Sequence, residues 1–149
     1  KAHAAAAATG LPSLADDSGL CVEALNQMPG VLSARWAGVA RADGGDAANN
    51  RLLLAQLADG PPERRAATCR CVLALVLPDG TEIIEVGEMP GRILAAEQGA
   101  GGFGYDPLFA ADGYDVSTAE LTAEDKSAIS HRGKALRQLA PKLAEVLTT

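Results

Sequence analysis

The chain contains 149 residues with 19 acidic and 13 basic side chains, which gives a formal net charge of −6. This length suits one domain with its own hydrophobic core, and a hydrophobic share of 48% excludes a chain that is disordered by composition. The acidic balance excludes broad binding to nucleic acids or to anionic membranes, because both require a cationic surface.

The cysteines and the apolar segments narrow the class of protein further. Cys21, Cys69 and Cys71 do not have the spacing of a metal site, so we expect them to be buried, reduced thiols. The sequence shows no apolar run long enough to span a membrane and no signal-peptide pattern. We therefore expect a soluble, cytoplasmic protein that does not associate with membranes.

The chain opens with an alanine-rich segment, residues 1–9, for which we predict a helix that ends at Gly10. Residues 11–15 are apolar and predict a short strand that leads into Asp16-Asp17-Ser18-Gly19. Residues 20–26 predict a short helix before the next Pro-Gly turn.

The rest of the chain alternates between helical and extended patterns. In order, we predict a helix capped by Asp46, a strand over 67–77, a Pro78-Asp79-Gly80 hairpin turn, a strand over 81–87, a glycine-rich loop over 99–104, and a helix over 127–147 that Pro141 kinks or restarts. No repeat or linker divides these elements. Together they predict one α/β domain over residues 1–149.

The first candidate for chemistry is Asp16-Asp17-Ser18-Gly19, which follows an apolar strand. Paired carboxylates beside a hydroxyl and a glycine are a common way to hold a hard cation such as Mg²⁺. Neighbouring side chains of an extended segment point to opposite faces, so we expect only one of the two carboxylates to face a site. The alternative is an Asx turn in which Asp16 or Asp17 caps the following helix.

The second candidate is the loop over residues 99–107, in which glycines surround Phe103 and Tyr105. Aromatic side chains are scarce in this chain, and one in a flexible glycine setting suits stacking on a flat ring. The segment matches neither the phosphate-binding loop nor the dinucleotide fingerprint. The alternative is a hairpin loop that buries a core phenylalanine.

The third candidate is residues 126–137, a basic island without any acidic residue in an otherwise acidic chain. It surrounds Ser130-His131-Arg132-Gly133 near a predicted helix start, which itself favours anions. His131 and Arg132 supply donors for a carbonyl oxygen or a phosphate. The alternative is a solvated basic face of a helix.

The order of these motifs resembles one known family, the inosine triphosphate pyrophosphatases, also called XTP/dITP diphosphatases. Six segments that span nearly the whole chain carry the resemblance: Ala15-Asp16-Asp17-Ser18-Gly19-Leu20, Pro29-Gly30-Val31, Ser33-Ala34-Arg35-Trp36-Ala37-Gly38, Gly101-Gly102-Phe103-Gly104-Tyr105-Asp106-Pro107-Leu108-Phe109, Ala119-Glu120-Leu121, and Lys126-Ser127-Ala128-Ile129-Ser130-His131-Arg132-Gly133. The resemblance implies an α/β fold with an elongated mixed sheet, helices in two lobes, and a substrate cleft between the lobes. It also implies a homodimer.

The resemblance further implies a Mg²⁺-dependent enzyme that hydrolyses ITP, dITP or XTP to the monophosphate and pyrophosphate. The implied roles cover the following residues: Asp17 as catalytic carboxylate and metal ligand, Asp16 as its support, Ser18 as a substrate contact, Phe103 as the stacking ring, Gly104, Tyr105 and Asp106 as the rest of the base pocket, Lys126, His131 and Arg132 as nucleotide contacts, and Lys1 as a phosphate contact.

The chain departs from the family pattern at its start, where the family's first strand, phosphate loop and metal-binding glutamate have no counterpart. We therefore expect an N-terminally truncated member with little activity of its own. A purine nucleotide-binding or regulatory module that does not hydrolyse is the main alternative. A related pyrophosphatase associated with septum formation is a further one, against which the Ser-His-Arg-Gly and Phe-Gly-Tyr-Asp motifs count.

Overall fold

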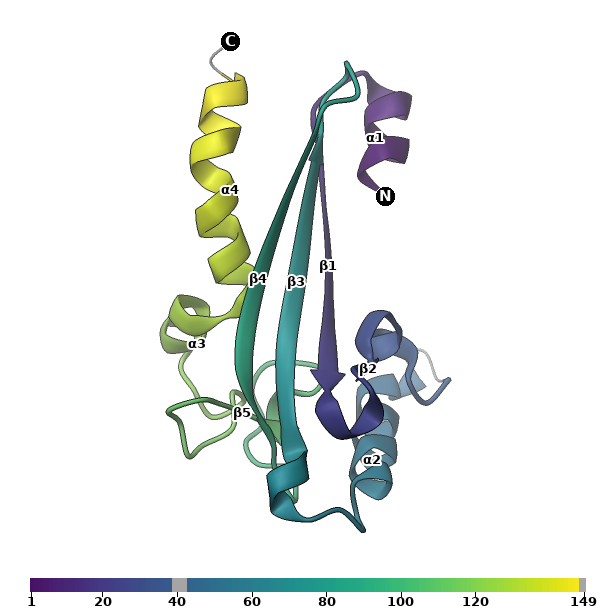
Figure 1. The fold of residues 1–149 in the computed structure, drawn as a ribbon, viewed down its shortest axis with the longest axis vertical. Coiled ribbons are helices and arrows are strands. Elements are labelled where there is room, and N and C mark those ends of the chain that lie inside the picture. Colours follow the sequence, from purple (N-terminus) through teal and green to yellow (C-terminus); the bar gives the residue numbers. More distant parts are fainter. Residues whose placement is uncertain (39–42, 148–149) are drawn as a thin grey trace.

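One long sheet runs along most of the length of the molecule (Figure 1). The structure is a computed structural model that describes residues 1–38 and 43–147. In chain order the elements are α1 (Ala2–Thr9), β1 (Ser13–Val22), η1 (Glu23–Leu25), β2 (Met28–Pro29), η2 (Gly30–Arg35), α2 (Gly45–Gln56), η4 (Pro62–Arg65), β3 (Ala66–Val76), β4 (Glu82–Ile93), η5 (Asp106–Leu108), β5 (Phe109–Ala111), α3 (Ala123–Ile129) and α4 (His131–Leu147), where η denotes a 3₁₀ helix.

The sheet has the strand order β2-β1-β3-β4-β5. β3 is its centre, because it pairs with β1 from Ser13↔Val76 to Val22↔Ala67 and with β4 along the other edge. The predicted α/β fold with an elongated sheet flanked by helices is confirmed. Where the resemblance implied a mixed sheet, the four pairings between the described strands are all antiparallel.

The first strand is longer than its local sequence predicts. β1 continues through Asp16-Asp17-Ser18-Gly19 to Val22, so this motif lies inside a strand and not after one. The helix predicted over 20–26 is wrong, and only the short η1 turn forms there. The reason is tertiary, since pairing with β3 holds residues 13–22 extended and overrides a weak helical pattern.

The C-terminal helix breaks at a different place from the one expected. Ser130 is extended, with a ψ of 148°, and separates α3 from α4. No new helix begins at Pro141, which lies inside α4. The prediction that Pro141 restarts the helix is therefore wrong, and the break falls immediately before His131.

Two glycine signals are confirmed, and the helix near Asp46 forms without the predicted cap. α1 ends at Gly10, whose φ of 67° lies in the left-handed region. Gly80 also has a positive φ, of 90°, in the tight turn between β3 and β4. The helix predicted after Asp46 is α2, although Gly44 is its N-cap and Asp46 lies in its first turn. All three cysteines are free thiols as predicted, but only Cys71 is buried, while Cys21 and Cys69 are half-buried.

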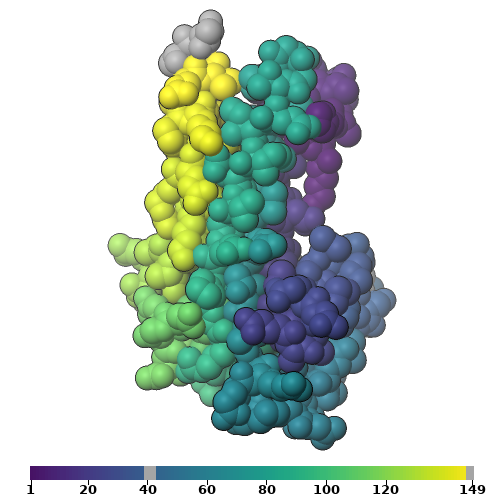
Figure 2. Space-filling model, viewed as in Figure 1, coloured from purple at the N-terminus to yellow at the C-terminus, as the bar shows by residue number. Residues whose placement is uncertain are grey.

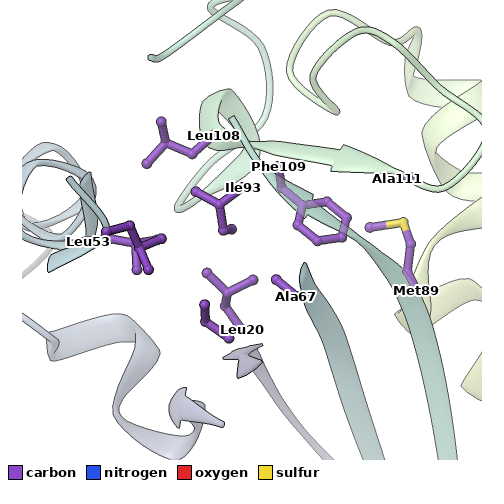
Figure 3. Close-up of a cluster of buried hydrophobic side chains, with 10 residues drawn as sticks. Leu20, Leu53, Ala67, Met89, Ile93, Leu108, Phe109 and Ala111 are labelled. Atoms are coloured by element: carbon purple, nitrogen blue, oxygen red, sulfur yellow. The ribbon is translucent and has the colours of Figure 1, made fainter. Parts of the chain in front are cut away.

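One face of the sheet carries two hydrophobic clusters. At one end α4 covers Cys71, Leu73 and Leu75 of β3. At the other end a larger cluster forms around Leu20, Leu53, Ile93, Phe109 and Met89. In this cluster the Phe109 ring lies beside the Met89 side chain (Figure 3). Strand alternation places both clusters on the same face.

The opposite face is covered less completely. There α1 packs its Ala2 and Ala6 against Val76 at one end of the sheet, while Ile84 and Val86 of β4 remain exposed. Figure 2 shows the resulting elongated shape, with α4 (yellow) lying along the sheet (teal).

None of the described helices combines the length and hydrophobicity that crossing a bilayer requires. A single domain over 1–149 stays a prediction, since it includes 39–42 and 148–149, outside the described residues.

Candidate active site

A pocket of about 640 Å³ opens among the described residues. Its walls come from β1, the loop before η5, α3 and the start of α4. Eight residues predicted for the site line it: Ser18, Phe103, Gly104, Tyr105, Asp106, Lys126, His131 and Arg132. Segments more than a hundred residues apart in sequence therefore meet in one cavity.

Asp106 organises the wall of the pocket. Its Oδ2 accepts the Phe103 backbone N–H at 2.8 Å, and its Oδ1 accepts the Thr118 hydroxyl at 2.9 Å. Lys126 from α3 donates to the same Oδ2 and forms an ion pair with it. Both partners are largely buried, with side-chain exposures of 22% for Lys126 and 14% for Asp106. Separating this buried pair would leave each charge without its partner, so the pair holds the two side chains in place.

The Phe103 ring is the aromatic surface of the site. It is 54% exposed although it belongs to a large apolar side chain, and it lines the pocket. The Lys126 ammonium lies 5.1 Å from the ring centroid, within the range of a cation–π contact. This lysine therefore links the aromatic ring to the Asp106 carboxylate. The structure contradicts the alternative of a core phenylalanine.

His131 begins α4 and faces the pocket as a neutral imidazole. Burial lowers its pKa to about 4, and the nearby positive charges of Arg132 and Lys126 act in the same direction. The carboxylates of Asp106 and Asp16 oppose this shift only in part. Its Nδ1 is buried and has no hydrogen-bond partner in the described part of the chain, as is also true of the Ser18 hydroxyl. Two polar atoms in the pocket lining thus await a partner.

The position of His131 depends on a glycine of the sheet. A Cβ placed on Gly87 of β4 would lie 1.9 Å from the His131 carbonyl oxygen and 2.6 Å from the Ala135 nitrogen. The start of α4 therefore rests directly on the backbone of β4. Gly87 pairs with Cys71, which pairs with Ser18, so the helix start lies over the same rung of the sheet as Ser18.

Arg132 and Lys1 connect the two aspartates of β1 to different elements. The Arg132 Nε donates to Asp16 Oδ2 at 2.7 Å. The Lys1 Nζ lies 3.4 Å from Asp17 Oδ1, and both side chains are well exposed, at 69% and 66%. The two carboxylates thus point to opposite sides of the strand, as predicted from alternation. Asp16, Asp17 and Lys1 do not line the pocket but adjoin it through Ser18.

Several residues that line the pocket were not predicted as site residues from the sequence. Asp46 lines the pocket and accepts the Gly104 N–H at 2.9 Å, although its sequence context suggested only a helix cap. The Ser33 carbonyl accepts the Tyr105 hydroxyl at 2.9 Å, and burial, followed by the charge of Asp46, raises the pKa of that phenol. Thr118 and Cys69 also line the cavity. No local pattern could have indicated them, because each enters through a tertiary contact.

Comparison with known proteins gives a consistent result. The Ham1 family profile matches residues 1–142. A dITP/XTP pyrophosphatase of Nocardia farcinica is 62% identical over 144 residues, which cover 97% of this chain and 68% of the relative. One from Frankia alni is 59% identical over 153 residues, covering 100% of this chain and 75% of the relative.

Solved structures agree with the sequence matches. A nucleoside-triphosphatase / dITP/XTP pyrophosphatase from Mycobacterium abscessus superimposes with a TM-score of 0.81 at 53% identity, over 95% of this chain and 71% of that chain. The Ham1 protein of Staphylococcus aureus superimposes with a TM-score of 0.89 at 39% identity, over 97% and 72%. Sequence and fold lead to the same assignment, and the chain is a member of the Ham1 family.

Proposed function

We propose that this chain carries the nucleobase pocket and the catalytic carboxylate of a dITP/XTP pyrophosphatase. Such an enzyme hydrolyses a deaminated purine nucleoside triphosphate to its monophosphate and pyrophosphate. The observation that carries the proposal is the pocket itself, because Phe103, Ser18 and His131 line one cavity. The printed names of relatives that are 62% and 59% identical support the same activity.

The donors of the pocket suit a 6-keto purine. A purine that stacks on Phe103 would place its edge near the start of α4, where His131 and Arg132 lie. Asp16 accepts only the Nε–H of Arg132, so the other guanidinium N–H groups can donate to a keto oxygen. The 6-amino group of adenine would leave these donors unpaired, which is a strong basis for rejection.

Asp17 is the proposed catalytic carboxylate. Its exposed side chain can orient a water molecule and accept its proton, while the adjacent pocket holds the base. Lys1 beside it is placed to contact the phosphates. In this arrangement β1 joins recognition to catalysis, because Ser18 lines the pocket and Asp17 precedes it by one residue.

Asp17 also fits the proposed Mg²⁺ ion. The described residues contain no cluster of three His, Cys, Asp or Glu side chains that could form a dedicated metal cage. Mg²⁺ is commonly held by only one or two carboxylates together with substrate phosphates and waters, and a single exposed carboxylate suits that mode. When bound, the ion would neutralise phosphate charge and stabilise the leaving pyrophosphate.

The experiment that tests this proposal compares keto and amino purines. Pyrophosphate release from dITP and dATP would be measured on the 149-residue chain with Mg²⁺, and binding of IMP and AMP would be measured by calorimetry. Because we expect little activity from this chain, the discriminating quantity is the ratio: any pyrophosphate should come from dITP in large excess over dATP, and IMP binding should exceed AMP binding. Equal turnover and equal binding of the two purines would contradict the proposal.

The pocket described above is also compatible with a second function. A nucleotide-binding module would use the same pocket but would not hydrolyse its ligand. It predicts preferential IMP binding without any release of pyrophosphate from dITP.

The homodimer remains a prediction too, which light scattering on the purified chain would test.

A further inference from the structure

The loop that presents Phe103 has little structure of its own. Gly102 and Gly104 flank Phe103, and both have positive φ values, of 72° and 63°. Glycines of this kind widen the range of backbone conformations that the free loop can adopt. A ring that stacks on a ligand needs one orientation, so contacts from outside the loop must fix it.

Two carboxylates from different elements hold two successive amides at this ring. Asp106 accepts the Phe103 N–H at 2.8 Å, and Asp46 of α2 accepts the Gly104 N–H at 2.9 Å. Asn50, also of α2, donates from Nδ2 to the Gly104 carbonyl oxygen at 3.2 Å. The peptide groups on both sides of Gly104 therefore form hydrogen bonds with side chains of the same helix, α2.

The helix is well suited to act as an anchor. Asp46 and Asn50 are four residues apart, so they lie on the same face of α2. Leu53, one turn further, is fully buried in the larger core cluster, and Asn50 itself is buried. A second attachment lies next along the loop, where the Tyr105 hydroxyl donates to the Ser33 carbonyl. The Gly104–Tyr105 part of the loop is thus held by the η2–α2 region, in addition to the Asp106 contact at Phe103.

We infer that Asp46, assisted by Asn50, is a positioning residue for the nucleobase: it holds Gly104 and thereby orients the Phe103 ring for stacking. This inference rests on the proposed function, since it assumes that Phe103 stacks on a purine. Asp46 acts through the loop backbone and does not replace any of the donors that read the base edge.

A double-mutant cycle separates positioning from a general structural role. Calorimetric Kd values for IMP would be measured for the intact chain, Asp46→Ala, Phe103→Ala and the double variant. We expect Asp46→Ala to weaken IMP binding about tenfold, as for loss of a charge-assisted hydrogen bond. In the Phe103→Ala background the same change should cost less than about twofold, because the ring it orients is gone. Additive effects would overturn the inference.

Two further variants complete the design. Asp46→Asn retains an oxygen that can accept the Gly104 N–H and should restore most of the affinity. Asp59→Ala removes an exposed carboxylate just beyond the end of α2 and should leave IMP binding unchanged. If Asp46→Ala does not fold, as judged by its thermal transition, Asn50→Ala takes its place in the cycle with the same expectation.

A ligand-free measurement keeps the inference apart from the proposed function. Hydrogen exchange of the Gly104 amide should be about tenfold faster or more in Asp46→Ala than in the intact chain or Asp59→Ala. Absence of any IMP preference in the intact chain would refute the proposed function alone. Unchanged exchange at Gly104 would refute the positioning role, whatever the chain binds.

Discussion

The proposed base pocket and the Lys1–Asp17 pair adjoin at neighbouring residues of β1, Ser18 and Asp17, yet they are built differently. In the pocket, Lys126 and Asp106 are largely buried, and Asp106 accepts hydrogen bonds from two further groups. Lys1 and Asp17 are more than 65% exposed and meet at 3.4 Å. The first pair is fixed by packing, whereas water competes for the second.

This difference shows which of the two pairs is held in place before any ligand binds. Among the groups proposed for recognition, Asp106 and Lys126 are held by neighbouring elements without a ligand. The carboxylate proposed for catalysis has freedom to move and to accept new partners, which suits a group that must meet phosphates, metal and water together. The following predictions test this contrast.

The largest effect is expected for catalysis alone. In an active form of the enzyme, Asp17→Asn should lower the rate of pyrophosphate release from dITP by about a hundredfold or more, as for removal of a general base. Calorimetric binding of IMP should not change, because Asp17 lies outside the pocket. Asp59→Asn makes the same charge change at an exposed site and serves as the control. A fully active Asp17→Asn chain would exclude Asp17 as the base.

The next effect concerns stability and compares the two lysines directly. Lys126→Met leaves the buried Asp106 carboxylate without its counter-ion and should lower the free energy of unfolding by about 2 kcal/mol. Lys1→Met removes an exposed partner and should change it by less than about 0.5 kcal/mol. Urea denaturation followed by circular dichroism measures both. Equal losses for the two variants would contradict the contrast.

A third test uses pH. The pKa of His131 is lowered from 6.5 to about 4 in the folded chain, so between these values the unfolded state binds more protons than the folded state. The free energy of unfolding should therefore fall as the pH is lowered from 6.5 to 4, by roughly 2 kcal/mol for this group. Denaturation at several pH values should show a shallower slope in His131→Gln.

The matched variant for this test is His3→Gln, which removes the chain's other histidine from the exposed start of α1. If His131→Gln and the intact chain lose stability equally over this pH range, then His131 is not the buried neutral group that the structure shows.

The smallest effect is expected at the ring. Phe103→Ala should weaken IMP binding about tenfold, or about 1.4 kcal/mol, as for loss of one stacked aromatic. Because the ring is 54% exposed, the thermal transition should move little. Phe103→Tyr keeps a stacking surface and should bind IMP nearly as well. Undiminished binding by Phe103→Ala would place the purine elsewhere.

The sequence predicted the parts of the fold whose causes are local. Gly10 ends a helix and Gly80 closes a hairpin through backbone conformations that glycine adopts easily, so both could be recognised from neighbouring residues. The extension of β1 to Val22 could not, because its pairing partner Ala67 lies in another strand. The break at Ser130 likewise depends on how α3 and α4 pack.

The site shows the same division. Phe103 and the segment from Lys126 to Arg132 stood out by composition and by the resemblance, and the structure brings them together. Asp46 did not stand out, since its partner Gly104 is 58 residues away and an aspartate at a helix start has an ordinary explanation. Contacts of this kind become visible only when the chain is folded.

The contact at Gly87 has a consequence for the history of this pocket. No side chain separates β4 from the carbonyl of His131, so the backbone of β4 limits how closely the start of α4 can approach the sheet. A single methyl group at position 87 would lift the start of α4 and with it both donors. Position 87 and the pair 131–132 should therefore change together among relatives, and a descendant that acquired a bulkier ligand could do so through one codon remote from every ligand contact.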